Sequence, residues 1–515
     1  MGRTVSTFVL LSLLCSPLIA IAIAPVNVSS TSFVISDSSD FIRGPTVNLV
    51  SNDTASIFWR TATSENSIVH FGKNTSLLES VTNATTVTDH LIRLDGLDMD
   101  TKYYYTVESG IVESEMYSFH TAPADGEEFR LVIAGDNRPG SSEHPTQPEI
   151  FSELAERIIE EEPHLVVLTG DFVYSVTTSD SANLNTWKLF TDITDHIGHY
   201  APVIGIVGNH DTGVSYGEYQ IQYYLDAFIN TGENTTYFSF DYAGVHFTIL
   251  DSELEDLEGH IVGTQYDWLV QDLDANPEKM KFVFAHRPLY PVTHVGSALD
   301  IDTDERDGLQ ELFEEKNVTL FAVGHDHTYD RVTVNGVVHI ITGGLGAPLY
   351  NSPWSTGLYH YMLSAVSAHA VNFSAITPDG TLFDQYNLPY DGPIEIVDRV
   401  IANTSSKPIG TVPFILFSED PVTKYFSWDG ASNTTEISGL PGPEGEHTLD
   451  VYAENSEGIW SSARFVFSTI IPDTGGTDTT TPPPGTPADI LLIVGIIGIV
   501  AVVIVIVVVI KMKKG

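Results

Sequence analysis

The stretch HLVVLTGDFVY (164–174) places a carboxylate directly after a run of apolar residues, and this pairing limits the folds that the chain can adopt. Every residue of LVVL (165–168) is apolar, whereas a strand with one face in water alternates apolar and polar residues. The run therefore predicts a strand buried on both faces. Asp171 follows it, and burying a carboxylate there costs free energy unless a cation or hydrogen-bond donors neutralise the charge.

Similar apolar runs alternate with helical patterns from about residue 128 to residue 385. In EIFSELAERIIEEEP (149–163) the apolar residues recur at the 3.6-residue period of a helix that packs on a core. Buried strands that alternate with amphipathic helices are typical of layered α/β proteins. We therefore predict an α/β domain over residues 128–385.

The segments on both sides of this domain have a β pattern. Residues 40–124 contain short alternating stretches separated by turn residues, such as TASIFWRTA (54–62), which predicts an all-β sandwich. Residues 394–470 return to this pattern in HTLDVYAENSEGIW (447–460). We expect two all-β sandwich modules flanking the α/β domain, the second of them immunoglobulin- or fibronectin-like.

Long apolar runs lie near both ends of the chain. Residues 1–24 have one Arg, an apolar stretch and then small residues, which predicts a signal peptide, with an uncleaved anchor as the alternative. Residues 490–510 are all apolar or Gly and are long enough to cross ~30 Å of hydrocarbon as a transmembrane helix. A Pro/Thr-rich stalk, 472–489, precedes them. The basic tail that follows, 511–515, is expected in the cytoplasm.

These features predict a single-pass cell-surface protein with an extracellular N-terminal ectodomain. Nine Asn-x-Ser/Thr sequons agree with export; they are Asn27, Asn52, Asn74, Asn83, Asn234, Asn317, Asn372, Asn403 and Asn433. The formal net charge of −45 argues against binding of nucleic acid or anionic lipid through bulk electrostatics. Cys15 is the only cysteine in the sequence, so we expect no disulfide.

Five segments of the α/β domain end an apolar strand with residue types that bind metal ions. They are GDNR (135–138), GDFVY (170–174), GNHD (208–211), AHRP (285–288) and GHDH (324–327). The carboxyl ends of the strands gather at one rim of such a domain, so these residues should converge. Carboxylate, carboxamide and imidazole ligands suit iron, zinc or manganese better than magnesium alone. Each segment alone would also fit a turn or a helix cap, but all five together predict a metal site.

This ordered set resembles the calcineurin-like metallophosphoesterases. Within that superfamily GDFVY, GNHD and GHDHTYDR (324–331) are most similar to the purple acid phosphatases. The segment GLDMDTKYYYTV (96–107) resembles a fibronectin type III module, with Tyr103 in its tyrosine corner and Trp59 in its core, and such a module precedes the catalytic domain in that family. The resemblance covers about residues 40–385 and implies a layered αββα metallophosphoesterase sandwich.

The resemblance also implies a pair of metal ions bridged by Asp171. The other implied ligands are Asp136, Tyr174 and His327 at the first metal, and Asn209, His286 and His325 at the second. A phenolate from Tyr174 favours Fe(III), with Zn, Mn or Fe(II) as its partner. The alternative for Tyr174 is a core aromatic residue whose hydroxyl is satisfied nearby.

The implied activity is that of an acid phosphatase-like hydrolase, in which a metal-bound hydroxide attacks a phosphomonoester and His210 acts as general acid. His294 is similar to a family histidine that contacts phosphate, and a loop histidine without a role is the alternative. Arg138 is a departure, because the family has Gly there and the wider superfamily has His. Arginine has no free lone pair for a metal, but its planar fork suits a phosphate. We interpret Arg138 as a ligand of substrate phosphate, with a surface salt bridge as the alternative.

Three functions are compatible with these features. The first is an exported, membrane-anchored phosphatase that acts on small phosphomonoesters. The second is a phosphodiesterase or nucleotide hydrolase that uses the same metals. The third is a catalytically silent recognition protein of the cell surface, which the two sandwich modules and the stalk would suit. The β-sandwich modules are also the candidate surfaces for pairing with a second copy of the chain.

Overall fold

The computed structural model describes residues 41–470, with gaps at 77, 140–146, 175, 214–218, 230–234, 278, 353–354, 356, 389–395, 399–406, 409–412, 414, 419–420 and 456–459. The expected signal peptide, stalk, transmembrane helix and basic tail lie outside these residues, as does Cys15. Within the described part, no helix has the length and apolar character needed to cross a membrane. The chain divides into two compact units, residues 1–392 and 393–515, which are described separately.

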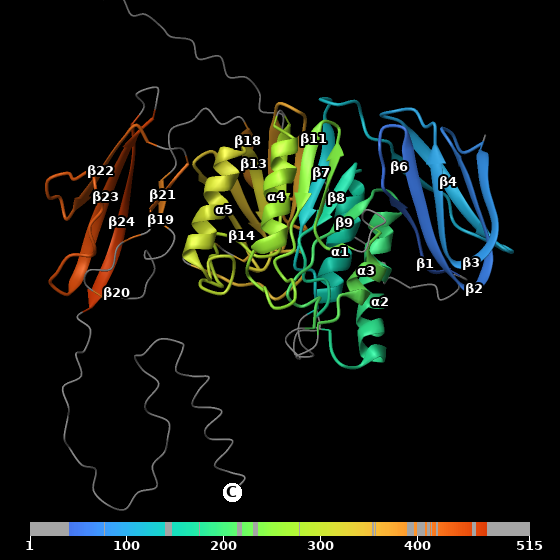
Figure 1. The fold of residues 1–515 in the computed structure, drawn as a ribbon, viewed down its shortest axis with the longest axis horizontal. Helices are drawn as coiled ribbons and strands as arrows, with labels where there is room; N and C mark the ends of the chain where they lie inside the picture. Colours follow the sequence, from blue (N-terminus) through green and yellow to red (C-terminus); the bar gives the residue numbers. More distant parts are fainter. Residues whose placement is uncertain are drawn as a thin grey trace, which may run out of the picture. The chain divides into compact units, whose positions relative to one another are not determined.

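The first unit begins with the predicted β-sandwich module (Figure 1). Its strands are β1 (Phe41–Asn48), β2 (Thr54–Gly72), β3 (Glu79–Asp95), β4 (Lys102–Ser109), β5 (Val112–Glu113) and β6 (Tyr117–His120). Trp59 is fully buried in the core and donates its indole N–H to Ser109 Oγ at 2.9 Å. The hydroxyl of Tyr103 accepts the backbone N–H of Asp98 at 2.9 Å, which is the contact expected in a tyrosine corner.

Two six-stranded sheets form the α/β domain. The first contains β7 (Phe129–Ala134), β8 (Leu165–Leu168), β9 (Val203–Gly205), β16 (Tyr361–Val366), β17 (Val371–Ile376) and β18 (Leu382–Leu388), in the order β18-β17-β16-β7-β8-β9. The second contains β10 (Phe238–Tyr242), β11 (Val245–Ile249), β12 (Met280–Phe284), β13 (Val318–Val323), β14 (Tyr329–Val334) and β15 (Val337–Thr342), in the order β10-β11-β12-β13-β15-β14. Within each sheet, the strands that precede the metal-binding motifs run parallel to one another, so their carboxyl ends lie at one edge of the sheet.

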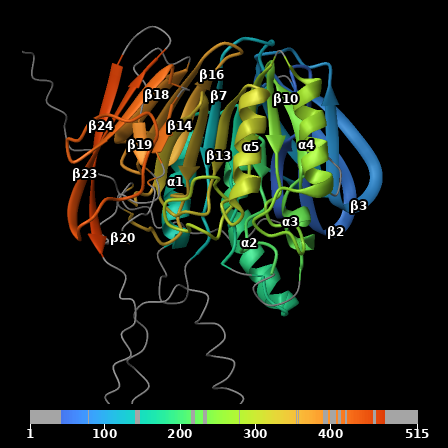
Figure 2. The same ribbon diagram turned by 60° about the vertical axis from the view of Figure 1, so that its left-hand side comes forward.

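Helices cover the outer faces of both sheets. They are α1 (Gln147–Glu160), α2 (Asp180–Gly198) and α3 (Gln222–Ala227) on the first sheet, and α4 (Gly263–Ala275) and α5 (Thr303–Glu315) on the second (Figures 1 and 2). Phe151 and Leu154 of α1 pack in one buried cluster with Val132 of β7, as the helical spacing predicts. On the other side, Phe313 of α5 contacts Phe321 of β13, with 5.2 Å between ring centroids.

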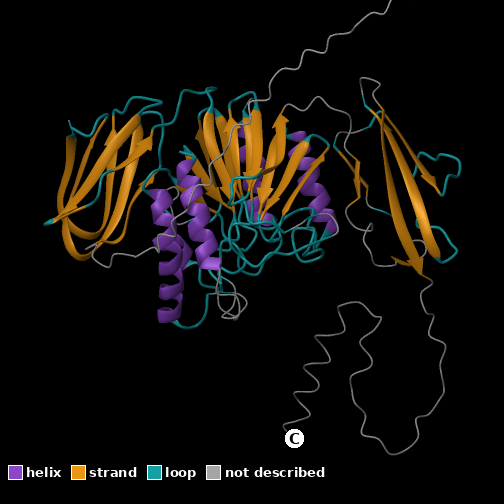
Figure 3. Cartoon of the chain, turned by 180° about the vertical axis from the view of Figure 1, so that it is seen from behind, coloured by secondary structure: helices purple, strands orange, loops and turns teal. Residues whose placement is uncertain are grey.

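The main core lies between the two sheets. Side chains such as Leu131 and Ile133 of the first sheet share one buried cluster with Phe247 and Phe284 of the second. Because both faces of each sheet are covered, the central strands are apolar along their whole length. The predicted αββα layering is therefore confirmed. The connecting loops gather at one end of the strands, where the candidate site lies (Figure 3).

The sandwich module contacts the α/β domain within the first unit. Arg43 of β1 forms an ion pair with Asp195 of α2 at 3.3 Å, and the same carboxylate accepts the backbone N–H of Gly44 at 2.9 Å. Arg60 of β2 forms two hydrogen bonds with Asp226 at 2.8 and 2.9 Å. Polar groups on both sides are therefore paired across this contact.

The second unit is a smaller β structure. It has a pair of strands, β19 (Ile396–Asp398) and β21 (Ile415–Phe417), and a four-stranded sheet of β20 (Lys407–Pro408), β24 (Trp460–Ile470), β23 (Gly445–Glu454) and β22 (Thr423–Trp428). Ile396 and Phe417 of the pair pack against buried Phe426, Leu449 and Phe467 of the larger sheet region. Two sheets that share a core agree with a sandwich, whereas its immunoglobulin-like character and pairing with a second copy stay predictions.

Candidate metal centre

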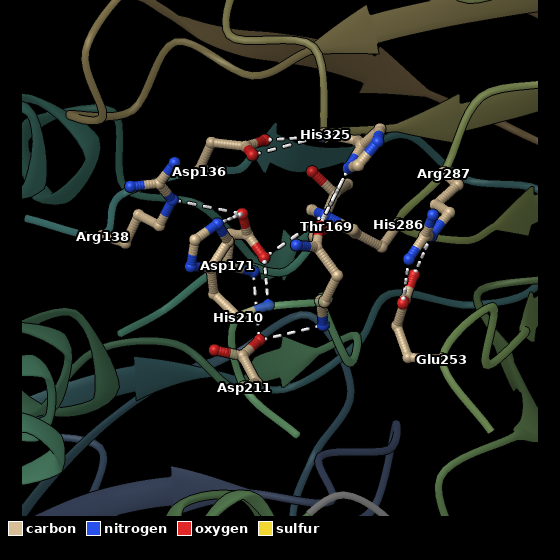
Figure 4. Close-up of polar contacts among 12 residues, drawn as sticks. Asp136, Arg138, Thr169, Asp171, His210, Asp211, Glu253, His286, Arg287 and His325 are labelled. Carbon is tan, nitrogen blue, oxygen red and sulfur yellow. Dashed lines mark hydrogen bonds and ion pairs between the residues drawn. The ribbon is translucent and has the colours of Figure 1, made fainter. Parts of the chain in front are cut away.

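The predicted metal-binding residues follow the ends of parallel strands in both sheets. Asp136 follows β7, Asp171 follows β8 and Asn209 follows β9, whereas His286 follows β12 and His325 follows β13. Because the two sheets face each other, these strand ends bring the residues together from both layers (Figure 4). The sequence prediction that they converge at one rim agrees with this arrangement.

The backbone adopts an uncommon conformation at three of these residues. Asp136, Asp171 and His325 have φ values of 58°, 56° and 70°, in the left-handed region that side chains other than glycine seldom adopt. Glycines precede the motifs because the chains approach closely. A Cβ atom at Gly208 would collide with Asp171, and one at Gly324 would collide with the carboxylate of Asp136. Backbone strain of this kind persists at functional sites when the surrounding structure holds it in place.

Four of the residues direct potential metal-ligand atoms at one another. His286 Nε2 lies 3.1 Å from Asn209 Oδ1, 3.2 Å from His325 Nδ1 and 3.3 Å from Asp171 Oδ1. The Nδ1–H of His286 donates to the carbonyl of Thr169 at 2.8 Å, so Nε2 of the neutral ring carries a lone pair. Burial lowers the pKa of His286 to about 4, which keeps the ring neutral. Lone pairs that converge in this way fit a metal cation, and we call these four residues the second-metal cluster.

Three residues form a neighbouring group that we call the first-metal cluster. Asp136, Asp171 and His327 each offer one ligand atom within 4.8 Å of the others, and all are buried. His327 donates Nδ1–H to the carbonyl of Pro348 at 2.6 Å, so its Nε2 is the atom left for a metal. Burial lowers the pKa of His327 to about 3. Asp171 belongs to both clusters, as expected of a bridging carboxylate.

The two carboxylates of the centre have opposite protonation tendencies. Burial raises the pKa of Asp136 far above its usual value, and the nearby charge of Asp171 raises it further. Burial would raise the pKa of Asp171 as well, but His210, His286 and Arg138 hold it well below its usual range. Ligand atoms of the two buried acids lie within 4.8 Å, so their negative charges repel each other. Cations bound between them would stabilise both in the ionised form.

Buried ion pairs and hydrogen bonds hold the loops that carry the cluster residues. Asp211, the last residue of GNHD, accepts the backbone N–H groups of Asp171 at 3.0 Å and of Gly208 at 2.9 Å (Figure 4). Next to His286, Arg287 forms two hydrogen bonds with buried Glu253 at 2.6 and 2.7 Å. Burial raises the pKa of Glu253 to about 7, although Arg287 lowers it. Our sequence analysis missed these roles, even though Asp211 and Arg287 stand inside two of the motifs.

Arg138 lies inside the centre. Its Nε is 3.2 Å from Asp171 Oδ2 and its terminal NH2 is 3.5 Å from His327 Nε2, while only 9% of the side chain is exposed (Figure 4). The structure therefore shows an ion pair, but a buried one, whereas the alternative considered from the sequence was a pair on the surface. Binding of substrate phosphate by Arg138 stays a prediction.

The predicted proton donor, His210, and the predicted phosphate contact, His294, lie at the edge of the centre. His210 donates Nδ1–H to the carbonyl of Tyr174, and its Nε2 lies 3.8 Å from Asp171 Oδ2. Burial lowers the pKa of His210. His294 Nδ1 lies 2.6 Å from the carboxylate of Asp326, and its ring centroid is 4.5 Å from that of His325. Both histidines thus use Nδ1 for a fixed partner and leave Nε2 for other contacts.

Two tyrosines border the first-metal cluster. The side chain of Tyr174, the predicted phenolate ligand, is 41% exposed, and its ring centroid lies 5.8 Å from the guanidinium carbon of Arg138. Tyr350, which the sequence analysis did not select, stacks on His327 with 4.4 Å between ring centroids. Burial raises the pKa of Tyr350. No motif in the sequence points to Tyr350, because it follows a Gly-rich loop remote from the other site residues.

Comparison with known families agrees with this geometry. Residues 129–329 match the calcineurin-like phosphoesterase family, and residues 43–121 match the N-terminal domain of purple acid phosphatases. The central domain is a calcineurin-like metallophosphoesterase. The resemblance expected from the motifs is therefore confirmed, and the fibronectin-like module is the N-terminal domain found in purple acid phosphatases.

The chain is similar in sequence to several named plant proteins. Purple acid phosphatase 23 of Arabidopsis thaliana is 25% identical over 286 residues, which cover 49% of this chain and 60% of that protein. Probable inactive purple acid phosphatase 24 of the same plant is 26% identical over 299 residues, 48% of this chain and 46% of that protein. Phosphoenolpyruvate phosphatase of Allium cepa is 25% identical over 377 residues, 66% of this chain and 74% of that protein.

A solved structure shares the fold. Purple acid phosphatase PPD1 from yellow lupin (Lupinus luteus) seeds superposes with a TM-score of 0.55 and 18% sequence identity, over 67% of this chain and 74% of that chain. By sequence, the match spans 60% or less of the length of the first two of these relatives.

Proposed function

We propose that this chain hydrolyses small phosphomonoesters at the two metal clusters. The observation that carries the proposal is the convergence of four potential ligand atoms: His286 Nε2 lies within 3.3 Å of His325 Nδ1, Asn209 Oδ1 and Asp171 Oδ1, and His325 Nδ1 lies 2.9 Å from Asn209 Oδ1. Such a set is unfavourable without a cation and is the donor set that iron, zinc and manganese prefer. Carboxylate, carboxamide and imidazole donors of this kind fit the pair of metal ions that the family uses.

The bound metals would supply the chemistry, and residues of both clusters would hold them. When bound, the metal ions would polarise the phosphoryl oxygens and lower the pKa of the attacking water. Asp136 and His327 would hold the first metal, Asn209, His286 and His325 would hold the second, and Asp171 would hold both. Asp211 keeps the Asp171 and Asn209 loops in place through its hydrogen bonds to Asp171 and Gly208.

The chain's own proton donor is His210. Its Nδ1–H is bound to the carbonyl of Tyr174, so the proton for a leaving alkoxide would come from Nε2. Burial lowers the pKa of His210, so the ring would carry this proton only under acidic conditions. His294 is fixed by Asp326 in the same way, and in the protonated ring its Nε2–H would donate to a phosphate oxygen.

Support for a monoester comes from the relatives. One of them is named a phosphoenolpyruvate phosphatase, and its match extends over 74% of that protein. A phosphodiesterase or nucleotide hydrolase would use the same metals and stays the second candidate. A silent recognition protein is the third, and one relative is named probably inactive. The convergence of potential ligand atoms in both clusters favours an active enzyme over that third candidate.

We also propose that the enzyme lies on the outside of the cell and that residues 490–510 anchor it in the membrane. The support comes from the sequence patterns of residues 1–24 and 490–510 and from the sequons. The sequon asparagines within the described part are all exposed, as glycan attachment requires; they are Asn52, Asn74, Asn83, Asn317, Asn372 and Asn433.

A comparison of two substrates tests the proposal. The full-length protein, loaded with iron and zinc or manganese, is assayed with p-nitrophenyl phosphate and with bis(p-nitrophenyl) phosphate. Asp171→Asn serves as the inactive variant, and Asp95→Asn, at an exposed position of the sandwich module, serves as the matched control. We expect monoester turnover that Asp171→Asn abolishes and Asp95→Asn retains. Faster diester turnover would favour the second candidate, and no turnover of either ester by the metal-loaded protein would favour the third.

A further inference from the structure

The two metal clusters differ in the charge that lies next to them. In the second-metal cluster, acceptor atoms of Asn209, His286 and His325 face one another. In the first-metal cluster, the guanidinium of Arg138 already lies against two of the three ligands, Asp171 and His327. A fixed positive charge is thus present on one side of the centre, where the family motif has a glycine.

Arg138 contacts the very atoms that a first metal would need. His327 uses Nδ1 to bind the carbonyl of Pro348, so Nε2 is its one free ligand atom, and this atom lies 3.5 Å from the NH2 of Arg138. Asp171 directs Oδ1 towards His286 and accepts the backbone N–H of His210 with the same oxygen. Its other oxygen, Oδ2, lies 3.2 Å from Arg138 Nε.

These contacts compete with a metal ion for the same atoms, most strongly at His327 Nε2. An imidazole Nε2 has a single lone pair, which can accept from Arg138 or bind a metal but cannot do both. The guanidinium stays protonated at all ordinary pH values and has no lone pair, so it cannot become a ligand itself. A divalent or trivalent ion would also meet the like charge of Arg138 at close range in a buried site.

We propose that Arg138 and the first metal compete for Asp171 Oδ2 and His327 Nε2, so that the first site binds metal much more weakly than the second. This inference rests on the proposed function in taking the two clusters as metal sites. With its guanidinium at these atoms, Arg138 neutralises the buried charge of Asp171. When the first metal binds, Arg138 must leave these two atoms.

The surroundings indicate where Arg138 goes. Tyr174 lies on its solvent side, 41% exposed, with its ring centroid 5.8 Å from the guanidinium carbon. The guanidinium already lies over this ring, so a shift towards Tyr174 would keep Arg138 on an aromatic face, a favourable position for a cation. Loading of the first metal would thereby release Arg138 to bind the phosphate of the substrate.

Metal-binding measurements test this inference without any substrate. The full-length protein is stripped of metal and titrated with Zn²⁺ by calorimetry, and its metal content after dialysis is measured by mass spectrometry. We expect one tight and one weak site in the natural protein. Arg138→Met, which keeps much of the volume without the charge, and Arg138→His, which supplies a ligand, should tighten the weak site by about 10- to 100-fold, the range expected for one hydrogen bond between charged groups. Arg93→Ala, which removes an exposed arginine of the sandwich module, should change neither site.

Other outcomes would overturn the inference. Two equally tight sites in the natural protein, unchanged in both Arg138 variants, would show that Arg138 does not compete with the metal. Loss of metal in a folded Arg138→Met protein, checked by circular dichroism, would show that Arg138 supports the site instead. Because the readout is metal affinity, tightening of the weak site would support the inference even if neither ester were hydrolysed, which would contradict the proposed function alone.

Discussion

Asp211 Oδ2 accepts the backbone N–H of Asp171 at 3.0 Å, so one buried carboxylate holds the residue that joins the two metal clusters. The same side chain accepts the N–H groups of Phe172 at 2.9 Å and Gly208 at 2.9 Å. Asp211 is fully buried, and its burial and the charge of Asp171 raise its pKa. The loops after β8 and β9 therefore depend on one side chain that does not itself belong to either cluster.

Replacement of this carboxylate should damage both stability and metal binding. In Asp211→Asn an amide N–H would face backbone donors, so we expect the free energy of unfolding to fall by about 1–3 kcal/mol, the cost of buried donors left without an acceptor. Bound metal should fall as well, because the Asp171 loop loses its support. Urea unfolding and metal analysis measure the two effects, with Asp95→Asn as control. If Asp211→Asn kept the free energy of unfolding and the metal content of the natural protein, the loops after β8 and β9 would not depend on Asp211.

His294 should matter for turnover but not for metal binding. Its Nδ1 lies 2.6 Å from Asp326 Oδ1, which fixes the ring and directs Nε2 away from that partner. We expect His294→Ala to lower kcat/KM for p-nitrophenyl phosphate by about 10- to 100-fold, the range expected for one hydrogen bond to a charged phosphate, with metal content unchanged. Asp326→Asn should lower it less and mainly through KM, because the imidazole remains but loses its fixed orientation. Unaltered kinetics in His294→Ala would assign this histidine to the loop alone.

The contact between the sandwich module and α2 should contribute to stability. Arg43 pairs with Asp195 at 3.3 Å, with 12% and 10% of the two side chains exposed, and also donates to the carbonyl of Asp226 at 2.8 Å. Arg43→Ala should therefore lower the free energy of unfolding by about 1–3 kcal/mol. Arg93→Ala removes an exposed pair and should cost less than about 1 kcal/mol. Equal midpoints of urea unfolding in both variants would contradict a stabilising role for the contact.

His246 should make stability depend on pH. Its Nε2 lies 2.9 Å from Asp272 and its Nδ1 lies 2.8 Å from Asp241. Burial alone would lower the pKa of His246, but these two carboxylates outweigh burial and raise the pKa above its ordinary value of 6.5. A raised pKa means that the contribution to stability is complete below pH 6.5 and is lost as the pH rises through the folded-state pKa.

Thermal unfolding at several pH values checks this sign. The melting temperature of the natural protein should exceed that of His246→Gln by more at pH 5.5 than at pH 8.5. An exposed histidine, changed in His369→Gln, provides the matched control. If the natural protein exceeded His246→Gln in melting temperature by more at pH 8.5 than at pH 5.5, the pKa of His246 would be lowered and not raised in the folded protein.

The layers of the fold and the ligand set could be predicted because each depends on local patterns. LVVL (165–168) is apolar along its length since both faces of β8 are covered, and Asp171 follows it at the rim. The positions of Arg138 and Tyr350 could not be predicted in this way. Arg138 stands in a motif, but its pairing with His327 depends on how two sheets pack, and Tyr350 comes from a loop with no recognisable spacing.

The measurement that tests the account most directly is the dependence of phosphomonoester hydrolysis on bound metal. The full-length protein is stripped of metal, iron and zinc are added back stepwise, and p-nitrophenyl phosphate turnover is measured against metal content. The account predicts no turnover in the stripped protein, recovery that follows the metal bound, and no recovery in His286→Ala. Undiminished turnover in the stripped protein, or full recovery in a His286→Ala protein that binds no metal, would contradict it.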